Sequence, residues 1–260
     1  MTSFATLINA SRQPSGSLAF NVPDDWLQGR TAYGGFTAAI AYHAAKSVEA
    51  ELPPLRSAQI AFIGPVSSDV QVRASLLRRG KSSAFVQARV TSNGELSMLG
   101  TFLFMADRPS ELALLAPRAP TVPAPEDAEP ALRGKGPAYR SQFEFRHGAT
   151  TQDRSKPELL RWARLHERDG VDAVTELFLI GDALPAGILP LFDVPPIISS
   201  ANWTVHVHSD IATHDGWWLV HNKGESAVNG ISSQLMSVWN RNGDAAVTSS
   251  QTVSYFPAVK

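Results

Sequence analysis

The sequence predicts an α+β protein built from two similar domains, each an antiparallel sheet wrapped around one buried helix. The first observation is an internal repeat: an apolar run, a Gly-x-Ser-Ser segment, an Asn-Gly turn and an aromatic strand follow one another twice. The second is a helix that is apolar on nearly every face. The third is the series of strand-like segments after that helix. A buried helix followed by antiparallel strands favours a layered α+β domain.

The repeat relates the two halves of the chain. Its first copy has landmarks at Ser57, Gly80 and Asn93, and the equivalent positions follow 143, 150 and 149 residues later, at Ser200, Gly230 and Asn242. A period of this length is too long for a solenoid unit. It indicates two fused domains, and such fusions usually place a site between the halves.

The repeat also sets the expected domain boundaries in this chain of 260 residues, of which 43% are hydrophobic. We expect an N-terminal domain over residues 1–106 and a C-terminal domain over residues 138–260. Residues 107–137 contain seven prolines and many alanines, which is typical of an extended linker. Proline removes backbone donors and disfavours helix at the residue before it, so no long helix is expected there.

The helix of the first copy is expected from about Phe36 to Ala50, before Pro53 and Pro54. The helix of the second copy is expected over the apolar residues 173–181. Strands are expected at 18–23, 58–63, 70–78, 84–91 and 96–105, and then at 141–146, 159–167, 202–208, 217–223, 232–240 and 246–256.

The composition limits the kinds of partner. The formal net charge is −1, from 23 basic and 24 acidic residues, so nothing favours binding to nucleic acid or to an anionic membrane. The absence of cysteine excludes disulfides, thiolate metal sites and a cysteine nucleophile. No apolar run is long enough for a membrane span, and the N-terminus is a poor secretory signal. We expect a cytoplasmic protein with a small-molecule partner, and a homo-oligomer stays open.

Four short motifs carry a resemblance to a known family. They are the Tyr33-Gly34-Gly35 helix start, Ala44-Ala45-Lys46 within that helix, SANWTVHVH at 200–208, and Asn242-Gly243 followed by VTSSQ at 247–251. In this order they resemble type II acyl-CoA thioesterases, over nearly the whole chain except the linker. The resemblance implies a double hotdog fold. It also implies hydrolysis of an acyl-CoA by direct attack of water to give free acid and CoA, with no metal or redox cofactor.

The resemblance further implies a water held by an aspartate, a threonine or serine, and a glutamine. Gln251 matches the glutamine, whereas Asn202 stands at the position matched to the aspartate. The hydroxyl residue falls at Glu225 or Ser226. Asn202 can orient a water but cannot act as a base, and Glu225 could supply the missing carboxylate. We therefore expect Asn202, Gln251 and one of Glu225 or Ser226 to share a pocket.

The glycines at the first helix form the expected substrate-binding part of the site. Gly34 and Gly35 allow a close backbone approach, and together with Tyr33 they begin a helix. A helix N-terminus favours negative charge, so it suits an oxyanion or a phosphate.

Two other functions stay open on sequence alone. Asn202 makes a non-catalytic acyl-CoA or lipid-binding module plausible. A double hotdog hydratase or dehydratase would need a histidine, His43 or His166, beside an acidic residue. A histidine-rich string also resembles a metal cluster, but three ligands must converge on a metal, so a surface loop is favoured there. Its residues are His206, His208, Asp210, His214 and Asp215.

Overall fold

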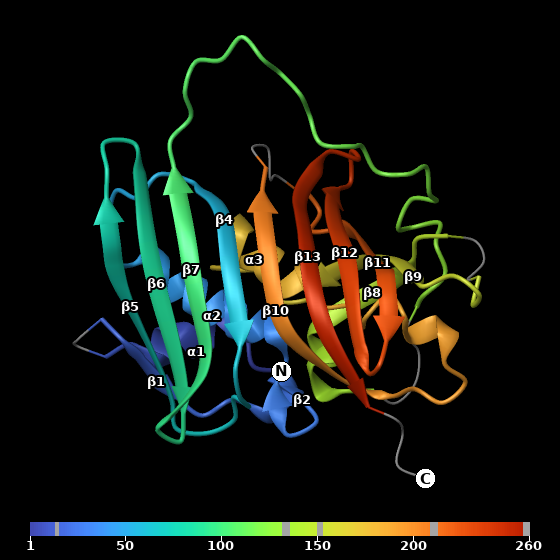
Figure 1. Cartoon of the computed structure of the whole chain (residues 1–260), viewed down its shortest axis with the longest axis horizontal. Coiled ribbons are helices and arrows are strands. Elements are labelled where there is room, and N and C mark those ends of the chain that lie inside the picture. The colour runs from blue at the N-terminus through green and yellow to red at the C-terminus, as the bar shows by residue number, and fades with distance from the viewer. Residues whose placement is uncertain (14–15, 132–135, 150–152, 209–212, 257–260) are drawn as a thin grey trace.

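The computed structural model describes residues 1–13, 16–131, 136–149, 153–208 and 213–256. Eleven strands form one antiparallel sheet in the order β1-β5-β6-β7-β4-β10-β13-β12-β11-β9-β8 (Figure 1). The strands of the first half are β1 (Leu18–Phe20), β4 (Leu55–Phe62), β5 (Val70–Arg79), β6 (Ser83–Ser92) and β7 (Glu95–Met105). Those of the second half are β8 (Phe143–His147), β9 (Glu158–Leu165), β10 (Ile197–Val207), β11 (Trp218–Val228), β12 (Ile231–Asn240) and β13 (Ala245–Phe256).

The two halves meet at the centre of the sheet, where β4 pairs with β10. Ile60 faces Trp203 in this pairing, and the two residues are 143 positions apart, which is the spacing of the sequence repeat. From this pair outward the strand order is the same in both directions, with β8 added at one edge. The sheet therefore has an approximate twofold axis at this pair, and the predicted double hotdog fold is confirmed.

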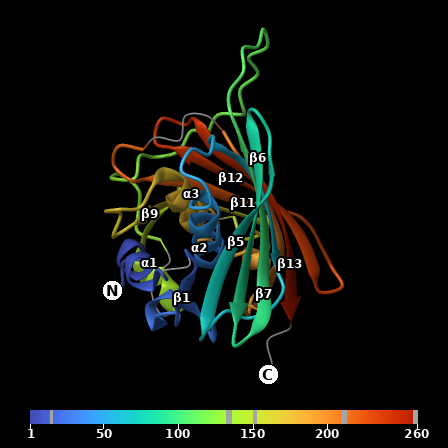
Figure 2. The same ribbon diagram turned by 90° about the vertical axis from the view of Figure 1, so that its left-hand side faces the viewer.

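Two central helices lie side by side on the concave side of the sheet (Figure 2). They are α2 (Gly34–Lys46) and α3 (Ala173–Gly181), so the predicted helix starts near Phe36 and Ala173 are confirmed. Helix α2 ends four residues before the predicted Ala50, with Ser47 as its cap. Its alanine-rich surface is buried nearly all round because it packs between the sheet and α3.

The predicted Asn-Gly hairpin connects β6 and β7. Asn93 and Gly94 both have positive φ, at 51° and 81°, which matches the right-handed twist of the flanking strands. The N-terminal helix α1 (Phe4–Ser11) was not predicted from the sequence. It buries Phe4 and Ile8. Small elements complete the chain: β2 (Leu27–Gln28), β3 (Thr31–Ala32) and three 3₁₀ helices at 24–26, 138–142 and 189–191. Among the described residues, no helix has the length and apolar character of a membrane span.

The proline-rich segment holds no helix or strand in its described residues, 107–131 and 136–137, apart from a single bridge at Pro130. Its second part is nevertheless tied to the outer face of the C-terminal sheet. The indole nitrogens of Trp239 and Trp162 each donate to a proline carbonyl, at 2.9 Å from Pro117 and Pro123 respectively. A proline lacks a donor but keeps its acceptor, so these prolines cover a buried tryptophan cluster. The boundary at residue 138 stays a prediction.

Candidate active site

A cavity of about 730 Å³ opens where the N-terminal end of α2 meets the C-terminal end of α3. Its walls come from both halves of the chain: the loop after β4, the segment around Tyr139, the loop after α3, the start of β10 and the end of β13. Most of the lining is apolar. The polar side chains that reach it are those of Gln28, Thr31, Thr37, Arg140, Asp182, Ser199, Ser200 and Gln251.

Asp182 supplies a carboxylate at the inner end of this cavity. It is the C-cap residue of α3, and protein encloses it except on the side that faces the cavity. Burial raises its pKa to about 6, against the opposing effect of hydrogen bonds from Gln251 and from the backbone N–H of Gly35. No cation contributes to this shift. A carboxyl group with such a pKa is poised to exchange a proton near neutral pH.

Gly34 and Gly35 let the start of α2 approach this carboxylate. A Cβ atom on Gly34 would lie 2.5 Å from Oδ2 of Asp182, and one on Gly35 would lie 2.7 Å from the carbonyl oxygen of Phe178. Neither position has room for a side chain. The glycines therefore serve the contact between the two helices, which places the positive end of α2 against Asp182.

Gln251 lies in the cavity wall, as predicted, and one carboxylate and one buried amide fix its orientation. Its Nε2 donates to Oδ1 of Asp182 at 2.8 Å, and its Oε1 accepts from Nε2 of Gln234 at 2.7 Å. Oε1 of Gln234 accepts in turn from the backbone N–H of Gly187 at 2.9 Å. Gln251 and Gln234 are 4% and 2% exposed, so their hydrogen bond to each other and the bond from Gly187 are shielded from solvent.

Asn202 does not join this cluster, so the expectation that it shares the pocket with Gln251 is wrong. A bulge in the pairing of β10 and β13 lies between Ser200 and Asn202. Such a bulge shifts the alternation of faces, and it leaves Ser200 on the cavity side while Asn202 shares the outer face with His206. Oδ1 of Asn202 accepts from the backbone N–H of Thr252, at 3.2 Å.

Glu225 and Ser226 also lie outside the cavity, on the exposed end of β11. The carboxylate of Glu225 forms an ion pair with Lys223 at 3.1 Å, and the hydroxyl of Ser226 lies 2.8 Å from that of Ser233. The resemblance placed the hydroxyl residue of the site at this strand end, but the side chains there face solvent.

Tyr33 supports the site without lining the cavity. It is 1% exposed, its hydroxyl donates to the carbonyl oxygen of Leu179 at 3.1 Å, and its ring stacks on Tyr139 at 4.3 Å between centroids. Tyr139 does line the cavity and donates to the carbonyl oxygen of Ala183. The two tyrosines thus hold the backbone on either side of Asp182.

The histidines considered from the sequence lie elsewhere. His43 is near the C-terminal end of α2 with Nε2 3.2 Å from Arg12, and burial lowers its pKa to about 4. His166 and His206 are exposed, and Nε2 of His208 is 3.2 Å from the hydroxyl of Thr248. Asp210 is outside the described residues. Within the described ranges, no three side chains are grouped as metal ligands.

Only one half of the molecule carries the acid and the two amides. In the sheet, Gln251 pairs with Trp203 on one side and with Gln234 on the other. At the equivalent place in the first half, Gly100 pairs with Ile60 and Ala88. Asp182 caps α3, whereas Ser47 caps α2. The approximate twofold axis therefore relates a polar site to positions that have small side chains.

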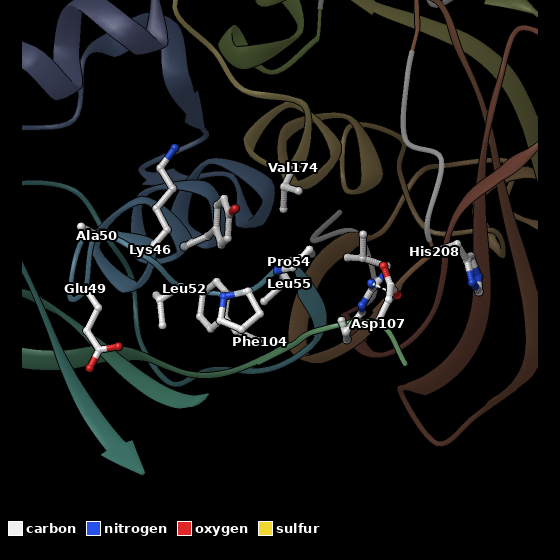
Figure 3. Close-up of a pocket in the computed structure, with 14 residues that line it drawn as sticks. Lys46, Glu49, Ala50, Leu52, Pro54, Leu55, Phe104, Asp107, Val174 and His208 are labelled. Atoms are coloured by element: carbon white, nitrogen blue, oxygen red, sulfur yellow. Dashed lines mark hydrogen bonds and ion pairs between the residues drawn. The ribbon is translucent and has the colours of Figure 1, made fainter. Parts of the chain in front are cut away.

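A second cavity of about 500 Å³ lies at the opposite ends of the two helices, where Leu52, Phe104 and Val174 form an apolar wall (Figure 3). Its two carboxylates are already paired: Asp107 with Arg56, at 2.5 Å, and Glu49 with Arg79, at 3.1 Å. It lacks the buried acid–amide chain, so we place the reactive site in the larger cavity.

Sequence reasoning missed Asp182, Ser200 and Gln234. One signal could have indicated Asp182: it is one of only two acidic residues in the largely apolar stretch 173–190, and it directly follows the second helix. An acid that directly follows a buried helix lies beside the core, where a carboxylate needs hydrogen-bond partners. Ser200 was quoted in a motif, but the bulge that turns it inward leaves no mark in the sequence.

Comparison with known proteins identifies the family. Residues 22–105 match the acyl-CoA thioesterase N-terminal domain, and residues 116–255 match the acyl-CoA thioesterase C-terminal domain. The chain belongs to the acyl-CoA thioesterase family. The match to the C-terminal domain begins inside the proline-rich segment, in agreement with the packing of that segment on the C-terminal sheet.

Solved structures share the thioesterase fold over nearly the whole chain. A protein of unknown function with a hot dog fold from Alicyclobacillus acidocaldarius has a TM-score of 0.88 at 20% identity, and the match covers 100% of each chain. A candidate thioesterase II from Thermobifida fusca has a TM-score of 0.82 at 19% identity, covering 98% of this chain and 99% of its own.

A tesB protein from Mycobacterium avium subsp. paratuberculosis has a TM-score of 0.79 at 17% identity, covering 98% of this chain and 100% of its own. At these identities the structures support the fold alone. No curated protein matches the sequence.

One prediction follows from the position of Asn202. Because its side chain lies outside the cavity, Asn202→Asp should leave kcat and KM for acyl-CoA hydrolysis within about twofold of the wild type. Steady-state kinetics on one acyl-CoA measures this. A large gain of activity would restore Asn202 as a site residue.

Proposed function

We propose that this protein hydrolyses acyl-CoA thioesters in the larger cavity, with Asp182 as the general base. The observation that carries the proposal is a half-buried carboxylate with a pKa of about 6, held by Gln251 and facing a largely apolar cavity. Family membership supports thioester hydrolysis as the general activity. The resemblance also implies an aspartate, a hydroxyl residue and a glutamine, and the cavity lining supplies one of each in Asp182, Ser200 and Gln251.

In this mechanism Asp182 removes a proton from a water molecule whose oxygen attacks the thioester carbonyl carbon. Gln251 and Ser200 orient that water and the thioester. Negative charge develops on the carbonyl oxygen, and the N-terminal end of α2 at Gly34, which lines the cavity, is a positive pole that can stabilise it. The tetrahedral intermediate then collapses with cleavage of the C–S bond. The proton on Asp182 passes to the departing sulfur, so the products are the free acid and CoA.

The lining suggests where the substrate lies. Side chains of Phe62, Leu184, Leu189, Ile198 and Val253 give the cavity an apolar wall that suits an acyl chain. Polar side chains such as Gln28 and Arg140 also line it, and they suit the CoA portion.

A panel of acyl-CoA substrates tests the function. Released CoA is followed with a thiol-reactive dye across short, medium and long chains. We expect turnover that depends on chain length and that is lost in Gln251→Ala, because the water loses an orienting partner. Binding of acyl-CoA without turnover in the wild type would instead indicate a non-catalytic binding module.

A hydratase or dehydratase is less well supported. Such chemistry needs a histidine beside an acid, and none of the residues that line the larger cavity in the described structure is a histidine. His43 is near the far end of α2 and His166 is exposed. An assay with an enoyl-CoA should therefore give no hydration product.

The pH dependence of hydrolysis should follow the ionisation of Asp182. Below its pKa the carboxyl group is protonated and cannot accept a proton from water. Its pKa is raised to about 6, so kcat/KM should rise with pH through about 6 and then level off. A pH profile from 4.5 to 8 measures this. A profile that is flat across that range would contradict Asp182 as the base.

A further inference from the structure

The hydrogen-bond chain that leads away from Asp182 continues past Gln251. Gln234 donates to Gln251, and Gly187 donates to Gln234. We propose that Gln234 is a positioning residue that sets the direction of the Gln251 amide, so that its NH₂ group faces Asp182. This inference rests on the proposed hydrolytic function of the cavity.

The direction of the chain follows from its two ends. The backbone N–H of Gly187 can only donate, so the atom of Gln234 that faces it is Oε1. The Nε2 of Gln234 then faces Gln251 and requires an acceptor there, which is Oε1. Nε2 of Gln251 is left to face Asp182, whose ionised carboxylate can only accept. A backbone group in the loop after α3 thus determines which end of Gln251 meets the reacting carboxylate.

Without Gln234, the amide of Gln251 could rotate by 180°. Its carbonyl oxygen would then face the carboxylate, and two acceptors would oppose each other unless Asp182 kept its proton. The donation from Gln251 lowers the pKa of Asp182, against the effect of burial. Its loss should therefore raise the pKa of Asp182 and remove the base from the pH range in which the wild type works.

The other titratable groups around Asp182 do not obscure a shift in its pKa. Tyr33 at the start of α2 and Tyr139 in the 138–142 helix are the titratable groups whose pKa values respond to its charge, and burial raises both pKa values. Both tyrosines are therefore neutral in the working range. The charged side chain that lines the same cavity is Arg140.

The fold itself does not require a glutamine at this place. The strand β6 has Ala88 at the position equivalent to Gln234, and it faces Gly100. That half of the sheet holds the same register without either amide. A buried amide at Gln234 is therefore better explained by its contact with Gln251 than by the needs of the sheet.

The experiment compares three variants of the full-length protein on one acyl-CoA substrate. Gln234→Leu removes the hydrogen bonds that Gln234 makes with Gln251 and Gly187, at similar side-chain size. Gln234→Glu keeps the shape and the acceptor for Gly187, and it can donate to Gln251 only while the introduced carboxyl group is protonated. Ser232→Ala is the matched control, because Ser232 lies on the same buried face of β12, two residues away, and its hydroxyl has no hydrogen-bond partner among the described residues.

For Gln234→Leu we expect kcat to fall by about 10- to 100-fold with KM nearly unchanged. The pH at which activity rises should also increase from about 6, because the pKa of Asp182 is higher. For Gln234→Glu we expect activity to fall at higher pH, where the introduced carboxyl group ionises and reverses the Gln251 amide. Ser232→Ala should match the wild type in both measurements.

The outcomes separate this inference from the function on which it rests. An inactive wild type would overturn the proposed function. An active wild type whose pH profile and kcat are retained in both Gln234 variants would overturn the positioning role alone. Thermal melting of each variant identifies loss of folding. If Gln234→Leu unfolds, the pH profile of Gln234→Glu still tests the positioning role. A profile that rises and levels off at the same pH values as that of the wild type would contradict the proposal.

Discussion

Replacing Asp182 by asparagine should lower kcat for acyl-CoA hydrolysis by about 10²- to 10⁴-fold, the range expected when a positioned general base is removed. Asparagine has the same shape, and its Oδ1 can still accept from Nε2 of Gln251. It cannot take a proton from water. The residual activity should also lose the rise through pH 6.

The stability of this variant separates a chemical role from a structural one. Burial disfavours the ionised form of Asp182, as its raised pKa indicates, so a neutral side chain should not destabilise the fold at pH 7. Thermal melting should show a midpoint no lower than that of the wild type. Asp193→Asn is the control, because this acid lies on the protein surface and should affect neither measurement. Wild-type activity in Asp182→Asn would exclude Asp182 as the base.

Replacing Gly34 by alanine should lower activity by about 10²-fold or more. The new methyl group would lie 2.5 Å from the Asp182 carboxylate and 3.0 Å from the Phe62 ring, so one of them must move. A displacement of about 1 Å at a reacting group is enough for a loss of this size. Steady-state kinetics of Gly34→Ala on the best acyl-CoA substrate measures it.

Gly80→Ala is the matched control for this prediction. A Cβ at Gly80 would come no closer than 3.3 Å to a neighbouring atom, the hydroxyl of Ser83, and Gly80 does not line the cavity. Its activity should stay near that of the wild type. Equal activity of Gly34→Ala and wild type would mean that the approach of α2 to Asp182 is not needed for turnover.

The two halves of the molecule contribute differently to the larger cavity. Both central helices and both half-sheets contribute to the larger cavity, yet the acid and the two amides all come from the second half. Gly34 and Gly35 are the residues of the first half that lie against the acid. The Asp182 and Gly34 variants therefore test the same reacting group from the two halves of the chain.

The amino-acid sequence by itself determined the architecture, and the reason is periodicity. The repeat spacing of 143 residues places Ile60 opposite Trp203 on the twofold axis, and the apolar helices begin at or near the predicted residues. Alternation and turn chemistry are local properties, so they can be seen without knowing the fold. Gln251 was identified differently, through the resemblance of its motif to type II acyl-CoA thioesterases.

The tertiary structure alone decided which polar residues meet. A one-residue bulge puts Ser200 inside and Asn202 outside, although both lie in one motif. Asp182 and Gln251 are 69 residues apart, and the docking of α3 against β13 brings them together. The same docking buries the carboxylate and raises its pKa to about 6. The convergence and burial of side chains are long-range properties of the fold. The reactive group at Asp182 therefore forms only when the tertiary structure forms.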